Sequence, residues 1–147
     1  MTLPGEADTL RVAQAMARIV RPGDTLLLSG AIGAGKSAFA RGLIRARLGR
    51  AEDVPSPTFT LVQTYDAPDG DIWHCDLYRL THPDEALELG LEEAFETAIC
   101  LIEWPDRLGD AAPPDALDLT FQAGDAAHHM TIRGPAAWAT RLQDLHV

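Results

Sequence analysis

The 147-residue sequence contains no asparagine, and Lys36 is its only lysine, because the other basic residues among the twelve are all arginines. A GTPase of the Ras type reads guanine with an Asn-Lys-x-Asp motif, which a chain without asparagine cannot contain. That route to GTP specificity is therefore excluded. Any function that needs an asparagine side chain or a second lysine is excluded in the same way.

Cysteine and long apolar runs are also scarce. Cys75 and Cys100 both lie in apolar, strand-like segments, where a small buried thiol is far commoner than a disulfide or a metal ligand. No apolar run approaches the roughly 20 residues that span a bilayer. The N-terminus lacks the basic and apolar regions of a secretory signal. We therefore expect a cytoplasmic protein that is not inserted in a membrane.

Basic residues are outnumbered by 22 acidic ones, which gives a net charge of −10. Such a surface repels phosphate backbones, so autonomous binding of tRNA or DNA is not expected. An acidic surface suits a basic protein partner, but it also suits a protein whose charge only keeps it soluble. Composition alone does not decide between these two explanations.

Hydrophobic patterning predicts helices and strands that alternate along the chain, with proline and glycine at their boundaries. The predicted helices span residues 7–20, 36–48, 83–89, 91–95 and 135–145, and the predicted strands span residues 25–29, 58–65, 72–78, 98–102, 116–122 and 129–133. Asp8 or Thr9 is available as the N-cap of the first helix, and Gly49 as the stop of the second.

The order of these elements indicates the fold class. Buried strands that alternate with helices point to an α/β fold around a mainly parallel sheet with flanking helices. The strand pairs 58–65 with 72–78 and 116–122 with 129–133 are separated by short turns, so we expect hairpins that add antiparallel strands at the sheet edges. The length suits one domain, which we expect to span residues 1–147.

Residues 30–37, Gly-Ala-Ile-Gly-Ala-Gly-Lys-Ser, match the motif GxxxxGK[ST] in full and lie between a predicted strand and a predicted helix. The glycines let backbone N–H groups face phosphate oxygens, and the following helix adds the positive end of its dipole. Lys36 would reach the β- and γ-phosphates, and Ser37 would ligate Mg²⁺. An ordinary glycine-rich turn with a surface lysine is the alternative. Because the only lysine occupies this position, we predict a P-loop NTPase fold that binds ATP and Mg²⁺ through Gly30 to Ser37.

Two carboxylates and one hydroxyl are candidates to complete this site. Glu103 ends the apolar run 98–102, and Asp76 lies in another apolar strand, where each would meet the metal or the attacking water. The alternative for each is a strand-end carboxylate that caps a helix or pairs with Arg79 or Arg107. Thr58 follows two prolines in a loop where a nucleotide-sensing switch lies in many P-loop proteins, although many threonines simply begin a strand.

Taken together, four segments resemble the TsaE family. They are residues 30–37 with Gly42 in the following helix, Pro-Ser-Pro-Thr-Phe-Thr-Leu-Val at 55–62, His-Cys-Asp-Leu-Tyr-Arg-Leu at 74–80, and Ile-Glu-Trp-Pro at 102–105. Each later segment is weak evidence alone, but the order and spacing match across about residues 9–135.

The resemblance implies an ATPase that assists the synthesis of threonylcarbamoyladenosine at position 37 of tRNAs that read ANN codons. In that family the protein acts with TsaB and TsaD, and ATP hydrolysis supports their repeated turnover. Lys36 and Asp76 would then be catalytic, Ser37 and Glu103 would bind Mg²⁺, Thr58 would belong to the switch loop, Trp104 would lie beside the site and Glu6 would contact the nucleoside. The residues that would bind the triphosphate are Gly30, Ile32, Gly33, Ala34, Gly35, Lys36 and Ser37.

Two departures from the family pattern bear on activity. The family usually has Asp-Leu where this chain has Ala31 and Ile32, so we expect weak intrinsic hydrolysis. The last hairpin often carries a basic residue that faces the nucleotide, whereas this chain offers His128 and His129. Neighbouring residues on a strand face opposite sides, so both histidines cannot serve one site.

Two other functions remain compatible with the sequence. A stand-alone small-molecule P-loop kinase would transfer phosphate without a protein partner, but its lid arginines would have to come from the scattered Arg107, Arg133 and Arg141. A nucleotide-gated binding module would use ATP only to hold the Thr58 loop for a partner. Partner-dependent turnover distinguishes the accessory ATPase from both.

Overall fold

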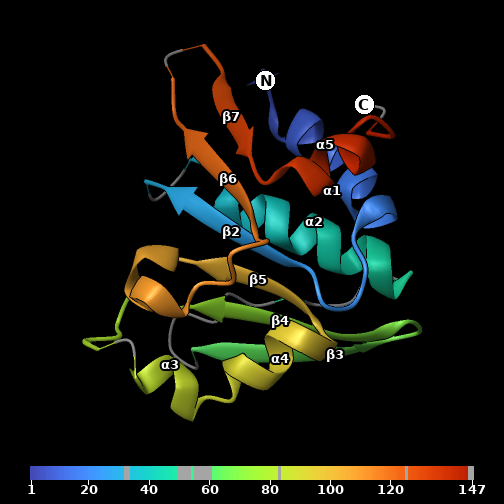
Figure 1. Ribbon diagram of the computed structural model, residues 1–147. Helices are drawn as coiled ribbons and strands as arrows, with labels where there is room; N and C mark the ends of the chain where they lie inside the picture. Colours follow the sequence, from blue (N-terminus) through green and yellow to red (C-terminus); the bar gives the residue numbers. More distant parts are fainter. Residues whose placement is uncertain (32–33, 50–53, 55–60, 83, 125, 146–147) are drawn as a thin grey trace.

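The computed structural model describes residues 1–31, 34–49, 54, 61–82, 84–124 and 126–145 (Figure 1). In chain order the elements are β1 (Thr2–Leu3), α1 (Glu6–Ile19), β2 (Thr25–Gly30), α2 (Lys36–Leu48), β3 (Val62–Ala67), β4 (Gly70–Asp76), α3 (Asp84–Glu88), α4 (Leu91–Thr97), β5 (Ile99–Glu103), the 3-10 helix η1 (Pro105–Ala111), β6 (Leu117–Gln122), β7 (His128–Arg133) and α5 (Ala136–Leu142).

In the described residues the strands form one seven-stranded sheet in the order β1-β7-β6-β2-β5-β4-β3. The four central strands, β6, β2, β5 and β4, are parallel to one another. Strand β3 is antiparallel to β4 at one edge, and β7 and β1 are antiparallel at the other. The predicted α/β fold, with a mainly parallel centre and antiparallel hairpins at its edges, is therefore confirmed.

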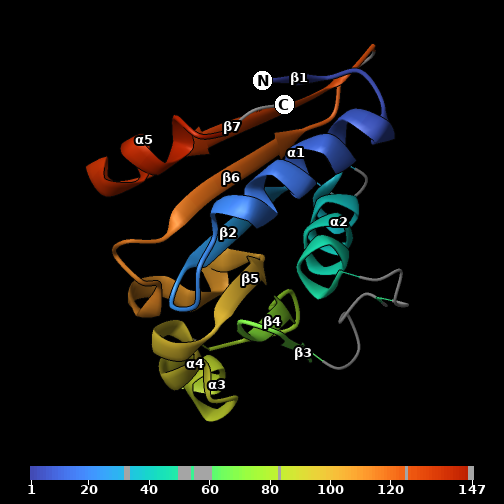
Figure 2. The same ribbon diagram turned by 90° about the vertical axis from the view of Figure 1, so that its right-hand side faces the viewer.

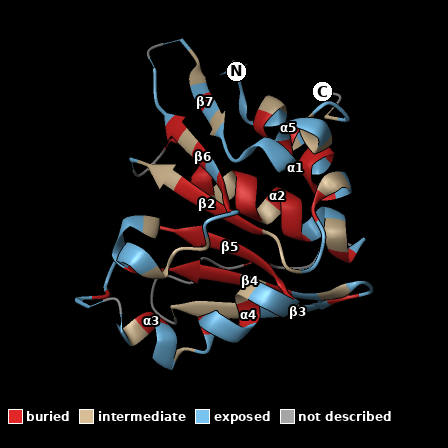
Figure 3. Ribbon diagram, viewed as in Figure 1, coloured by how far each residue is buried: buried red, intermediate tan, exposed pale blue. Residues whose placement is uncertain are grey.

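Helices cover the two faces of the sheet. Figure 2 shows α1 and α2 on one side and α3 and α4 on the other. The side chains of β5 alternate accordingly, because Leu101 packs in the core with α1 and α2, whereas Cys100 and Ile102 pack in the core with α3 and α4. Strands β2, β4 and β5 are mostly buried (Figure 3). Burial on both faces explains the apolar runs at residues 26–28 in β2 and 99–102 in β5.

The first helix begins differently from the prediction. Its N-cap is Gly5, so the expectation of Asp8 or Thr9 at that position is wrong. Asp8 lies within the first turn, where its Oδ2 atom accepts a hydrogen bond from the Gly5 N–H at 2.9 Å. A carboxylate at this position satisfies a free backbone donor and favours the positive helix end, so the acidic residue contributes from inside the helix.

The other element boundaries are close to those predicted. Helix α2 spans the predicted residues, and Gly49 ends it with a positive φ of 72°. Helix α5 ends at Leu142 rather than at residue 145. The hydrophobic pattern of the sequence did not predict β1 or η1. A strand of two residues and a short 3-10 helix that begins with proline show no hydrophobic periodicity. The start of the predicted strand at 58–60 lies outside the described residues. None of the helices in the described part of the chain combines the length and apolar character needed to cross a membrane.

Candidate functional site

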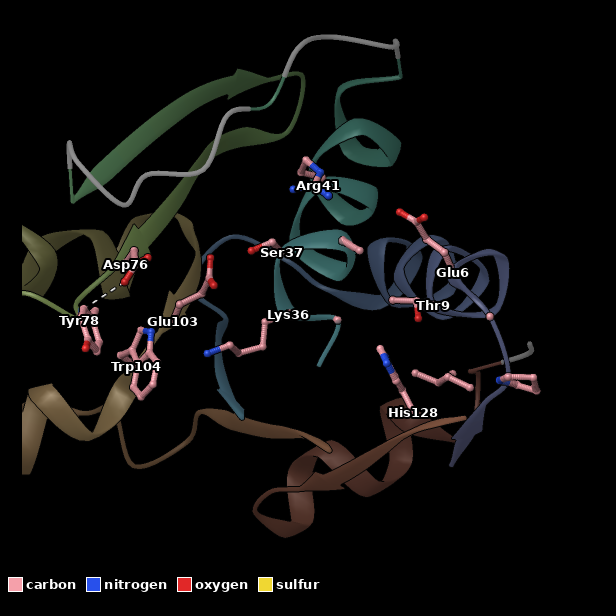
Figure 4. A pocket seen from close by; sticks show the side chains of 15 residues that line it. Glu6, Thr9, Lys36, Ser37, Arg41, Asp76, Tyr78, Glu103, Trp104 and His128 are labelled. Atoms are coloured by element: carbon pink, nitrogen blue, oxygen red, sulfur yellow. Dashed lines mark hydrogen bonds between the residues drawn. The ribbon is translucent and has the colours of Figure 1, made fainter. Parts of the chain in front are cut away.

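A pocket of about 640 Å³ lies at the carboxyl ends of the parallel strands (Figure 4). Ligands of open α/β sheets bind at this edge, where the chain leaves one strand and crosses to another. The pocket is lined by Leu3, Pro4, Gly5, Glu6, Thr9, Gly35, Lys36, Ser37, Ala38, Arg41, Asp76, Tyr78, Glu103, Trp104 and His128.

Two glycines shape the described part of the loop between β2 and α2. Gly30 has a φ of 135°, and a Cβ atom there would lie 2.2 Å from the Phe121 carbonyl oxygen on β6, so no other residue fits. Gly35 has a φ of 108° and directly precedes α2. Lys36 and Ser37 thus lie in the first turn of a 13-residue helix, whose free N–H groups favour an anion. Ile32 and Gly33 lie outside the described residues.

The register of the sheet brings the two predicted carboxylates together. Asp76 and Glu103 are paired directly across β4 and β5. The two residues are 6% and 4% exposed. Both lie on the face of the sheet that α1 and α2 cover, as the alternation of their strands requires. The Tyr78 N–H donates a hydrogen bond to Asp76 Oδ1 at 3.1 Å, drawn as a dashed line in Figure 4.

Glu103 also has a partner that the sequence did not reveal. The Nε2 atom of His74 lies 2.7 Å from Glu103 Oε2, and His74 is 1% exposed. The sequence offered one indication of His74. It is two residues from Asp76 on a predicted strand, so the two side chains share a face. Linking His74 to Glu103 needs the order of the strands, which spacing does not supply.

Lys36 and the aromatic residues meet at the same end of the pocket. The Lys36 Nζ atom lies 4.2 Å from the centre of the Trp104 ring, and Trp104 packs against Tyr78 with ring centres 4.9 Å apart. Trp104 has a positive φ of 58°, which is unusual outside glycine. This backbone turn follows Glu103 and places the indole beside the carboxylate and the lysine.

The other end of the pocket is built from helix and edge-strand residues. Glu6 and Thr9 come from α1, Arg41 from α2 and His128 from β7 (Figure 4). A Cβ atom on Gly35 would lie 3.5 Å from His128 Nδ1, so this ring faces the loop. Thr9, Arg41 and His128 were not predicted as site residues. For the histidine pair the sequence predicted only that His128 and His129 cannot both face one site.

Of the predicted site residues, the structure gathers Glu6, Gly35, Lys36, Ser37, Asp76, Glu103 and Trp104 around one pocket. Gly30 ends β2 and Ala34 lies in the loop that follows it, where Ala34 is 1% exposed. Thr58, like Ile32 and Gly33, falls outside the described residues. Among the residues that the structure describes, no group of three or more His, Cys, Asp or Glu side chains is placed to hold a metal ion.

Both cysteines are free and buried, as predicted. They pack on the face of the sheet opposite the pocket. Burial raises the pKa of the Cys100 thiol to about 12 and the pKa of Cys75 well above its ordinary value, with a smaller contribution from the neighbouring Cys100. Protonated thiols on the far face take no part in the site.

This arrangement defines an α/β protein whose glycine loop, helix start and two buried carboxylates share one pocket at the carboxyl edge of the sheet. The family model described as "Threonylcarbamoyl adenosine biosynthesis protein TsaE" matches residues 3–131. The chain therefore belongs to the TsaE family, whose curated members carry the name of tRNA threonylcarbamoyladenosine biosynthesis proteins.

Relatives from distant bacteria support this assignment. The chain is 40% identical over 124 residues to TsaE of Rickettsia conorii, covering 84% of this chain and 71% of the relative. It is 36% identical over 126 residues to TsaE of Bacillus subtilis, covering 84% and 78%. A crystal structure of Bacillus subtilis YdiB superimposes with a TM-score of 0.82 at 28% identity, covering 99% of this chain and 91% of that one.

Proposed function

We propose that this chain is a Mg²⁺-dependent ATPase with a P-loop NTPase fold in one domain, and that it acts with TsaB and TsaD in the synthesis of threonylcarbamoyladenosine on tRNA. One observation carries the proposal. The only lysine of the chain, Lys36, begins α2 directly after a glycine loop and shares a pocket with two buried strand-end carboxylates, Asp76 and Glu103. The proposed place of action is the cytoplasm.

The loop and the start of α2 are the proposed triphosphate site. Backbone N–H groups of residues 30–37, including Ile32, Gly33 and Ala34, would bind the phosphate oxygens, and Lys36 would hold the β- and γ-phosphates. The Lys36 Nζ atom lies 4.2 Å from the centre of the Trp104 ring. To reach a phosphate, its ammonium must therefore leave the indole, which remains as a wall of the site.

Ser37 and Glu103 fit a magnesium site of this class. A hydroxyl at the start of α2 and a buried carboxylate line one pocket, and Mg²⁺ prefers oxygen ligands completed by substrate phosphates and water. When bound, the ion would neutralise the charge that develops on the transferred phosphate.

Asp76 is the proposed hydrolysis residue. Its carboxylate lies beside Glu103 on the neighbouring strand. The Asp76 Oδ1 atom accepts a hydrogen bond from the Tyr78 N–H, which holds it in place. From there it would orient the attacking water or accept its proton. Thr58 is proposed as part of the switch loop, and Glu6, from the far end of the pocket, as a contact to the nucleoside. Ala31, in place of the family's acidic residue, supports weak turnover without partners.

The proposal is tested by phosphate release from ATP with Mg²⁺, with and without TsaB and TsaD from the same source. Lys36→Ala and Asp76→Ala are compared with Asp71→Ala, a matched control because Asp71 is an exposed carboxylate at the opposite end of β4. We expect turnover to rise with the partners and to fall by about 100-fold or more in Asp76→Ala, the range for losing a group that handles the reacting proton.

Other outcomes would contradict parts of the proposal. Turnover indifferent to TsaB and TsaD would overturn the accessory role and direct attention to a small-molecule phosphate acceptor. A nucleotide-gated binding module would be favoured by two results together. Lys36→Ala would lose partner binding, whereas Asp76→Ala would retain both partner binding and pathway activity. Asp71→Ala is expected to behave as the wild type throughout.

A further inference from the structure

His74 is a buried polar residue that the mechanism above leaves unexplained. It lies on β4, is 1% exposed and faces the core formed with α1 and α2, between Ile72 and Asp76 on the same face of the strand. It is not among the residues that line the pocket. The only hydrogen bond of its side chain to the described residues joins Nε2 to Glu103 Oε2 at 2.7 Å.

The Glu103 carboxylate decides which nitrogen of the His74 ring carries the proton. An ionised carboxylate can only accept, so we assign the imidazole proton to Nε2, which donates it to Glu103. The other ring nitrogen, Nδ1, is buried and has no partner in the described part of the chain. Burying a polar atom without a partner costs free energy, and an apolar side chain of similar volume would avoid that cost.

We propose that His74 is a positioning residue that orients the Glu103 carboxylate for the metal ion, an inference that rests on the proposed function. One hydrogen bond to Oε2 fixes the rotation of the carboxylate and leaves its other oxygen for the site. The sheet makes this precise placement possible, because His74 pairs with Leu101 while Asp76 pairs with Glu103, so the ring lies diagonally beside the glutamate. Partners of this kind orient metal ligands and raise metal affinity without touching the metal.

The test measures metal binding rather than turnover. Binding of Mn²⁺ in the presence of ADP is followed by the loss of the free Mn²⁺ signal in electron paramagnetic resonance, and ADP affinity is measured separately in EDTA. We expect His74→Phe, which keeps the ring but lacks the donor, to weaken Mn²⁺ binding by about 10- to 100-fold. ADP affinity without metal should stay unchanged, because His74 does not line the pocket.

Conservative variants separate positioning from folding. The amide of His74→Gln reaches about as far as Nε2 and should retain Mn²⁺ affinity to within about threefold, whereas the shorter His74→Asn should lose it like His74→Phe. This pair keeps the test decisive if His74→Phe does not fold. Ile72→Val is the matched control, since it trims a fully buried side chain of the same strand and face. Its Mn²⁺ affinity should equal that of the wild type.

A double variant tests whether His74 acts through Glu103. In Glu103→Gln, adding His74→Phe should cause no further loss of Mn²⁺ affinity. Wild-type affinity in His74→Phe and His74→Asn, or equal losses in the Gln and Asn variants, would overturn the inference and leave the proposed function standing. A wild-type protein that binds no Mn²⁺ with ADP would instead overturn the metal site itself, and the inference with it.

Discussion

At the scale of single residues, the pocket separates its charges along its length. Figure 4 shows Asp76 and Glu103 at one end, Glu6, Thr9 and His128 at the other, and Lys36 between them. A ligand that fills this pocket therefore meets carboxylates suited to a metal at one end and a mixed polar surface at the other. Substitution of neighbouring residues on one strand tests which side chains contact a bound ligand.

The histidine pair of β7 offers such a comparison. His128 lines the pocket beside Gly35, whereas His129 lies on the other face, with Nδ1 3.4 Å from the Thr2 hydroxyl. We expect His128→Ala to weaken ADP binding by about 3- to 10-fold, the value of one hydrogen bond, and His129→Ala to leave it unchanged. Isothermal titration calorimetry measures both. Unchanged ADP affinity in His128→Ala would mean that His128 makes no contact with the nucleotide.

The buried cysteines should be unreactive in the folded protein. Burial raises the pKa of Cys100 from 9.0 to about 12, which lowers its thiolate fraction near neutral pH about 1,000-fold. We expect a thiol reagent at pH 8 to label the native protein at least about 100-fold more slowly than the denatured chain. Because the pKa of Cys100 is higher in the folded chain than in the unfolded chain, its contribution to the free energy of unfolding is fully present below about pH 9. That contribution is lost as the pH rises toward 12. Comparable labelling rates before and after denaturation would contradict this burial.

At the scale of elements, the position of the lysine depends on how α2 packs. Helix α2 carries Lys36 and Ser37 in its first turn and lies against α1, which supplies Glu6 and Thr9 to the far end of the pocket. Gly42 lies where the two helices approach each other, and a Cβ atom there would be 2.9 Å from Leu10 Cδ2 and 3.0 Å from Ala13 Cβ.

At position 42 we expect glycine to stabilise the protein more than alanine, the reverse of the ordinary order of these residues in helices. Alanine is the better helix former by about 1 kcal/mol, but here it would overfill a close contact. We expect Gly42→Ala to lower the free energy of unfolding by about 1–3 kcal/mol in urea denaturation. Ala46→Gly, at an exposed position of the same helix, reports helix preference alone and should cost about 1 kcal/mol. A stabilised Gly42→Ala would show that the helices can separate without cost.

At the scale of the whole molecule, charge and sheet topology have separate consequences. The net charge of −10 is a property of the entire surface, whereas the pocket is a local product of four parallel strands that end at one edge. Membership of a family of tRNA threonylcarbamoyladenosine biosynthesis proteins thus goes together here with a net charge that disfavours contact with a phosphate backbone.

The free protein should therefore not bind tRNA by itself. In a gel-shift experiment at about 0.1 M salt we expect a dissociation constant weaker than about 100 µM, beyond the range of ordinary non-specific binding by basic proteins. A basic RNA-binding protein of similar size is the positive control. A shift at micromolar concentrations of this chain would mean that a local basic surface outweighs the net charge.

The sequence predicted most elements because their signals are local. The glycine loop, the helix that follows it and the apolar strands 98–102 and 116–122 are all readable within a few turns or residues. Short elements such as β1 escaped because two residues carry no period, and its pairing with β7 joins chain segments more than 120 residues apart. The N-cap was misassigned because Asp8 stabilises the helix start from inside the first turn.

What the sequence determined by itself is therefore the set of chemical groups and the elements that carry them: one lysine at a helix start, and carboxylates at two strand ends. Only the tertiary structure decided which groups meet. The strand order places β4 beside β5, so that Asp76 and Glu103 are paired and His74 reaches Glu103, and the last hairpin turns His128 rather than His129 toward the loop. These contacts join residues far apart in the chain, and the packing of the whole sheet, which no local pattern encodes, selects them.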